Sequence, residues 1–166
     1  MTDIEKVIIR SAYAEEADTL ADIEAACFPP AEAAEREQVR ARLRLFPENF
    51  LVAELDGKAI GFINGANTDR QALPDALYHD AALHIPNGDY QTVFGLNVLP
   101  EYRRSGVAGK LLRSYEKLAR ERGRKGLILT CKQHLIHYYE KYGYVNHGIA
   151  DSEHGGAVWN DMRYIF

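Results

Sequence analysis

The order strand, helix, strand between residues 90 and 132 limits the fold more than any other feature of the sequence. YQTVFGLNVL (90–99) predicts a strand that Pro100 ends, and GLILTCK (126–132) is a continuous apolar run typical of a buried strand. The segment between them places its apolar side chains on one helical face, and Gly123 ends it. That face consists of Val107, Ala108, Leu111, Leu112, Tyr115, Leu118 and Ala119. Such a unit predicts two parallel strands joined by a crossover helix.

The rest of the chain predicts further helices and strands in one domain, residues 1–166, of mixed α/β (α+β) class. We expect strands at 7–13, 144–150 and 156–166, helices at 14–27, 31–45 and 135–143, and a hairpin over 49–68 that turns at Asp56-Gly57. Residues 69–89 lack clear periodicity, which predicts a long loop with a helical turn near 76–82. Long loops inside compact domains are often functional lids.

Composition and charge exclude several classes of function. The net charge of -4 argues against a general nucleic-acid coat, and no apolar run approaches the length of a membrane span. The first 13 residues have no long apolar segment of the signal-peptide kind. Cys27 and Cys131 lie far apart, which fits a reducing cytoplasm, although a disulfide between them stays open. Without H-E-x-x-H or C-x-x-C spacing, we expect no metal site.

The basic, glycine-containing segment RRSGVAGKLL (103–112) raises the question of which anion it binds. A nucleoside-triphosphate loop is excluded, because Arg104 stands where its first glycine belongs and Leu111 stands where its hydroxyl residue belongs. The dinucleotide fingerprint G-x-G-x-x-G is also absent, since Gly106 and Gly109 are the only glycines here.

A helix that starts near Gly106 presents free backbone N–H groups and the positive end of its dipole. Glycine lets the backbone approach a ligand closely, and Arg103, Arg104 and Lys110 add full positive charges. Together these features predict a pyrophosphate site that needs no magnesium. A capped helix with solvated arginines explains the same residues equally well.

The segment LNVLPEYRRSGVAGKLL resembles motif A of the GCN5-related N-acetyltransferase (GNAT) superfamily, in which V-x-P-x-[YF]-R is followed by [QR]-x-x-G-x-[GA]. The resemblance implies the GNAT fold: a central, mostly antiparallel sheet with a splayed parallel strand pair, flanked by about four helices. It also implies acetyl-coenzyme A (acetyl-CoA) as co-substrate. Backbone groups of the motif strand would pair with its pantetheine arm, and the helix start would hold its pyrophosphate. The residues implied are Leu96, Asn97, Val98, Arg103, Arg104, Ser105, Gly106, Val107, Ala108, Gly109 and Lys110.

The segment HLIHYYEKYGYVNHG resembles the second GNAT motif, F-Y-x-[KR]-x-G-[FY], and places Tyr139 at the position of the frequent catalytic tyrosine. A tyrosine, with a pKa of about 10, can protonate the departing CoA thiolate. Tyr138 and Tyr142 are alternatives by proximity. Trp159 is expected to belong to the core rather than to a substrate platform.

A base must remove a proton from the attacking amine, because an ammonium is not a nucleophile. In vertebrate arylalkylamine N-acetyltransferases two strand histidines act through water, and Thr92 and Phe94 stand at those positions here. The remaining candidate bases are Glu24, Glu32, His84 and His154, of which Glu32 and His84 are the main candidates. As a set they suggest an acidic, histidine-bearing acceptor pocket.

The segments CFPPAEAA, LTCKQHLIHYYEKYGY and SEHGGAVWNDM resemble a microbial, arylalkylamine N-acetyltransferase-like branch of the superfamily. The resemblance implies a cytoplasmic enzyme that transfers acetyl from acetyl-CoA to a primary amine, a small molecule, by direct attack in a ternary complex. Cys131 as an acyl carrier is a variant of that mechanism. The alternatives are a protein or peptide N-acetyltransferase and a non-catalytic acyl-CoA-binding module. The superfamily often forms homodimers, and the acceptor amine stays open.

Overall fold

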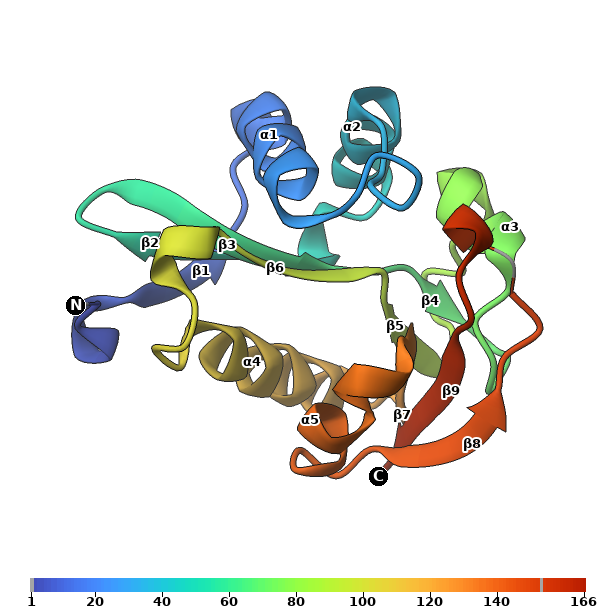
Figure 1. Ribbon diagram of the computed structural model, residues 1–166. Helices are drawn as coiled ribbons and strands as arrows, with labels where there is room; N and C mark the ends of the chain where they lie inside the picture. Colours follow the sequence, from blue (N-terminus) through green and yellow to red (C-terminus); the bar gives the residue numbers. More distant parts are fainter. Residues whose placement is uncertain (1, 153) are drawn as a thin grey trace.

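The computed structural model describes residues 2–152 and 154–166, and it has two sheets that meet at the middle of the molecule (Figure 1). The first sheet is antiparallel, in the order β1 (Ile8–Ser11), β2 (Phe50–Leu55), β3 (Lys58–Asn64), β6 (Gly95–Val98). The second has the order β4 (Asn67–Thr68), β5 (Tyr90–Val93), β7 (Gly126–Cys131), β9 (Asn160–Ile165), β8 (Val145–Ile149). Among its described strand pairs, β5 and β7 alone are parallel. The mixed class and the parallel pair predicted from the sequence are confirmed.

In the described part of the chain, five α-helices lie on the two sides of this framework (Figure 1). They are α1 (Ala17–Cys27), α2 (Arg36–Leu45), α3 (Asp75–His79), α4 (Val107–Glu121) and α5 (Ile136–Glu140). Helices α1 and α2 cover one face of the first sheet, whereas α4 and α5 lie on the opposite side. The predicted helical turn in the long loop is α3, followed by a 3-10 turn at Ala81–Leu83. No helix in the described part of the chain is both long and apolar enough to cross a membrane.

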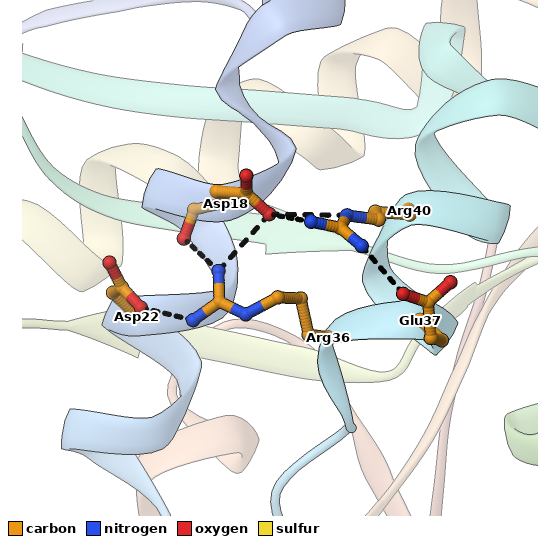
Figure 2. Close-up of polar contacts among 5 residues, drawn as sticks. All are labelled: Asp18, Asp22, Arg36, Glu37 and Arg40. Atoms are coloured by element: carbon orange, nitrogen blue, oxygen red, sulfur yellow. Dashed lines mark hydrogen bonds and ion pairs between the residues drawn. The ribbon is translucent and has the colours of Figure 1, made fainter.

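Helices α1 and α2 are joined at the surface by a network of ion pairs (Figure 2). Asp18 of α1 contacts Arg36 at 3.1 Å and Arg40 at 2.8 Å, and these arginines also pair with Asp22 and Glu37. Exposed pairs of this kind add little to stability. The helices are held in place mainly by buried apolar side chains, namely Leu20 and Ile23 of α1 and Val39 and Leu43 of α2.

The predicted strand 90–99 is divided at Phe94, and this break creates the gap in which the site lies. Up to Val93 the chain pairs in parallel with β7, but from Gly95 onward it pairs with β3 of the first sheet. Strand β6 is therefore an edge strand, and its outer side faces away from β3. The single strand expected from the sequence is wrong here, because its two halves pair with different sheets.

Candidate active site

The N-terminus of α4 forms a cradle of backbone amides. Gly106, which precedes the helix, has φ +93°, and Arg104 also lies in the left-handed region, at φ +60°. The first intrahelical bond runs from the Lys110 N–H to the Gly106 carbonyl, at 3.0 Å. The amides of residues 104–109 precede that bond and are therefore available to a ligand. Successive amides around left-handed residues at a helix start favour an anion.

Three of the predicted anion ligands are engaged elsewhere. The Lys110 ammonium donates to the carbonyls of Ile4, at 3.3 Å, and Val7, at 2.5 Å, so both it and the Lys110 amide are occupied. The Ser105 hydroxyl donates to the Tyr102 carbonyl, at 2.5 Å. Arg103 donates from Nε to the Val98 carbonyl, at 2.9 Å. The Lys110 charge therefore anchors the N-terminal segment instead of lining the cradle.

The backbone of β6 offers fewer open groups than the sequence suggested. Leu99 donates its N–H to the Ile60 carbonyl, and Asn97 is opposite Phe62 in the register. Because backbone groups of an antiparallel edge strand alternate, Asn97 faces β3, whereas Leu96 and Val98 face the gap. The Val98 carbonyl already accepts from Arg103. Leu96 and the Val98 N–H are the groups that can pair with an extended ligand.

Two adjoining cavities occupy the gap between β6 and β7. We call the larger, of about 500 Å³, the groove; it runs from the α4 cradle past Leu96 and Val98. We call the smaller, of about 100 Å³, the chamber; it lies between α1, α2, β5–β6 and β7. Six of the described residues line both cavities: Phe28, Glu32, Leu96, Leu135, Tyr139 and Trp159. A ligand in the groove and one in the chamber would meet at these residues.

Tyr139 lies at this junction. Its ring packs edge-on against Tyr138 and Tyr144, with centroids 5.3 and 5.7 Å away. Burial raises the pKa of its hydroxyl, which keeps the proton on the oxygen near neutral pH. Among the residues that the structure describes, none hydrogen-bonds to this hydroxyl. A fixed, protonated hydroxyl at the meeting point of two cavities can donate a proton to a leaving group.

The other nucleophile and acid candidates fit less well. Tyr142 lies against the cradle, where a Cβ on Gly109 would collide with its hydroxyl. Cys131 lines the chamber, but burial raises the pKa of its thiol to about 11. A thiol that stays protonated is a poor acyl carrier. Of these candidate side chains, Tyr139 is the one that lines both cavities.

Three of the four candidate bases lie at the cavities, and the fourth lies away from them. Glu32 is at the junction, where its Oε2 pairs with Lys132 Nζ at 2.8 Å. Glu24 lines the chamber and accepts the Ala34 N–H at 3.0 Å. Burial raises its pKa above the usual range of a carboxyl. His154 also lines the chamber, but its Nε2 lies 2.9 Å from the Glu32 carbonyl, which requires a protonated Nε2.

The structure does not bring His84 to either cavity. Its Nδ1 accepts the Asn67 N–H at 2.9 Å, and its Nε2 lies 3.7 Å from Glu48. The ring packs at a tilt against Phe46, with 4.7 Å between the ring centroids. His84 was predicted as a base because it precedes the motif strand, but its ring fixes the long loop to the body of the domain.

Two chamber residues were not recognised as such in the sequence. Trp159, expected in the core, is only partly buried and lines both cavities, with its Nε1 donating to the His154 carbonyl at 2.8 Å. Arg42 of α2 is 4% exposed and lines the chamber. With Arg42 present, the chamber holds both signs of charge and is not the acidic pocket that the carboxylates suggested.

The segment around Gly155 closes the site. Gly155 has φ +63°, and a Cβ there would lie 2.6 Å from the Glu32 side chain. The glycine therefore lets the 154–159 segment pack directly on the loop between α1 and α2, which carries Glu32. Within residues 2–152 and 154–166, no group of three or more His, Cys, Asp or Glu side chains is arranged to hold a metal ion.

The split sheet, the amide cradle and the groove along an edge strand define a protein of the GCN5-related N-acetyltransferase fold. The sequence profile of the acetyltransferase (GNAT) family matches residues 17–144, so the chain belongs to this family.

Individual proteins agree with this assignment. The serotonin N-acetyltransferase of Mesocricetus auratus is 28% identical over 109 residues, which cover 65% of this chain and 51% of that protein. The uncharacterized N-acetyltransferase YkwB of Bacillus subtilis (strain 168) is 27% identical over 127 residues, 69% of this chain and 55% of that protein. The chain thus spans about half the length of these curated relatives. The GNAT-like decarboxylase GphF, solved with isobutyryl-CoA, superimposes with a TM-score of 0.82 at 20% identity, over 95% of this chain and 98% of that one.

Proposed function

We propose that this protein is an acetyl-CoA-dependent N-acetyltransferase that acts on a small primary amine by direct attack in a ternary complex. The observation that carries the proposal is that Tyr139 lies where the groove meets the chamber, and that the groove leads to the α4 amide cradle. Family membership and the N-acetyltransferase relatives support the same activity.

The groove suits acetyl-CoA in its chemistry. The amides of residues 104–109 and the Arg104 side chain would hold the pyrophosphate. Leu96 and the Val98 N–H would pair with the amides of the pantetheine arm, as in strand addition. When bound, acetyl-CoA would supply the thioester carbonyl that the amine attacks.

The protein's own part in the reaction is to place the amine and to move two protons. Tyr139 would give its proton to the departing thiolate and regain one from the nitrogen, which loses its second proton as the amide forms; burial keeps the free hydroxyl protonated. A chamber carboxylate would take the proton from the ammonium before attack. We assign this role to Glu24 rather than to Glu32, because Glu32 is paired with Lys132, whereas Glu24 lines the chamber without such a pair among the described residues and burial raises its pKa above that of an ordinary carboxyl.

The size of the chamber favours a small acceptor over a protein. An apolar cavity of about 150 Å³ holds benzene, so a chamber of about 100 Å³ admits only a few non-hydrogen atoms. A protein or peptide acceptor would have to enter by one short side chain or terminus, and it is the second candidate. The cytoplasmic location and the homodimer stay predictions from the sequence.

The base assignment predicts a particular pH dependence. A base must be unprotonated, so kcat/KM falls as pH drops through its pKa, and a raised pKa moves that acidic limb above the range of an ordinary carboxyl near 4.3. We expect Glu24→Gln to remove this limb and to lower kcat/KM at neutral pH by roughly 10²-fold. Glu32→Gln, the matched control at the junction, should retain the limb. A limb that persists in Glu24→Gln and disappears in Glu32→Gln would reverse the assignment.

An acceptor screen tests the proposed function itself. Purified protein, acetyl-CoA and panels of arylalkylamines, polyamines, amino acids and short peptides are incubated, and free CoA thiol is measured. Release that depends on a small amine, with the acetylated amine found by mass spectrometry, supports the proposal. Release only with peptides would support the second candidate. Tight acetyl-CoA binding without release for any acceptor would point to a non-catalytic binding module.

A further inference from the structure

Arg42 lines the chamber but not the groove. A third cavity, which we call the outer cleft, lies between α2 and the α3 region and shares Gln38, Arg42, Tyr78 and His79 with the chamber. Groove, chamber and outer cleft therefore follow one another, with Tyr139 at the first boundary and Arg42 at the second. An acceptor whose amine points to Tyr139 would have its other end near Arg42.

The Arg42 guanidinium is buried without a carboxylate partner. It is 4% exposed, and no Asp or Glu oxygen in the described part of the chain lies within 4.0 Å of it. It donates to the Tyr78 carbonyl at 2.9 Å and, weakly, to Asn64 Oδ1 at 3.5 Å. A guanidinium has five N–H donors, so most of those of Arg42 lack an acceptor among the described residues. Buried charges are normally paired closely, whereas Glu24 attracts this one without forming an ion pair within 4.0 Å.

The position of Arg42 is fixed although it has no carboxylate partner within 4.0 Å among the described residues. Its Cζ lies 4.4 Å from the centre of the Phe94 ring, and the hydrogen bond to the Tyr78 carbonyl holds one edge of the guanidinium. Tyr78 is held in turn by Thr130, with 3.0 Å between the two hydroxyl oxygens. A rigid guanidinium with free donors beside a cavity matches a planar carboxylate.

Glu24 gives the chamber a second, opposite charge. Its carboxyl accepts the Ala34 amide, and no Lys, Arg or His nitrogen among residues 2–152 and 154–166 pairs with it within 4.0 Å. Burial removes both Glu24 and Arg42 from water, which costs free energy. The attraction between the two charges offsets only part of that cost. A ligand with an amine and a carboxylate would complement both groups at once.

We propose that the acceptor is a small amino acid, whose carboxylate binds Arg42 and whose amine faces Glu24 and Tyr139. This inference rests on the proposed N-acetyltransferase function and narrows its substrate class. The chamber of about 100 Å³ limits the side chain to a few atoms, unless it extends into the outer cleft. Amines of similar size without a carboxylate leave Arg42 unpaired and should be poor acceptors.

The first test compares each amino acid with its amide, for example glycine with glycinamide and alanine with alaninamide. The amide keeps the size but removes the charge, and rates are expressed per concentration of neutral amine because the two amines differ in pKa. We expect kcat/KM to favour the amino acids by about 10- to 100-fold, as for a hydrogen bond to a charged group. Equal values for both members of each pair would overturn the inference while leaving the N-acetyltransferase activity in place. If none of the amines tested is acetylated, the proposed function and this inference are overturned together.

The second test changes the arginine. In Arg42→Gln the ratio of kcat/KM for the amino acid to kcat/KM for its amide should fall to about 1. Arg42→Lys should retain part of the preference for the amino acid. Arg40→Gln, on the exposed face of the same helix, is the control and should keep the full preference. A preference that survives in Arg42→Gln would contradict the assignment. If Arg42→Gln does not fold, as a thermal melt would reveal, Arg42→Lys and the amino acid and amide pairs on the unchanged protein still decide the question.

Discussion

Replacing Tyr139 by phenylalanine should lower kcat by about 10²- to 10⁴-fold, the range for loss of a positioned general acid. The substitution removes one oxygen and leaves the ring packed against Tyr138 and Tyr144. Because no described residue hydrogen-bonds to that oxygen, the protein loses no internal contact. The Kd for acetyl-CoA should change little, since in the proposed complex the cradle and β6 provide most of the binding. Steady-state kinetics and calorimetry measure the two quantities separately.

Tyr144→Phe is the matched control for this prediction. It removes a hydroxyl from a neighbouring buried ring that lines neither cavity, so kcat should stay close to that of the unchanged protein. Unchanged turnover in Tyr139→Phe would exclude this residue as the acid. An equal loss in both variants would show that the tyrosine cluster acts through packing and not through a proton.

The second large effect is expected for Gly106→Val. Gly106 has φ +93°, which L residues rarely adopt, so a β-branched residue must move the backbone out of the cradle geometry. The lost amide contacts are to a charged ligand, and losing about two of them corresponds to roughly 100-fold weaker acetyl-CoA binding. Calorimetric titration with acetyl-CoA and CoA measures the change directly.

Gly57→Val separates this effect from general backbone strain. Gly57 also has a positive φ, +80°, in the turn between β2 and β3, with nothing near its would-be Cβ and no contact with the groove. We expect Gly57→Val to lower the thermal stability comparably and to leave the Kd unchanged. Equal weakening of binding in the two variants would mean that the Gly106 substitution acts through stability alone.

The sequence predicted those parts of the site that depend on local rules. A strand, proline, basic residues and glycines before an amphipathic helix are sufficient to place the amide cradle, and the motif around Tyr139 is continuous in sequence. Which strands pair with each other depends on residues far apart in the sequence, so local rules do not predict it. Residues 90–99 have one uniform apolar pattern, and only the pairing of β5 with β7 and of β6 with β3 divides it at Phe94.

Side-chain partners far away in the sequence account for the remaining differences. Lys110 was expected at the anion site, but its ammonium bonds to Ile4 and Val7, more than 100 residues earlier. Arg42 belongs to a helix rich in arginines, and its neighbours Arg36 and Arg40 are exposed. Its burial depends on Phe94 and Tyr78, which the sequence does not bring together.

The central claim is that the amides at the start of α4 hold the diphosphate of coenzyme A. A crystal structure of the protein with CoA tests it most directly. We predict diphosphate oxygens within hydrogen-bonding distance of the amides of residues 104–109, with the pantetheine arm beside Leu96 and its sulfur near Tyr139. CoA bound at another place, or an empty cradle at saturating CoA, would contradict the account.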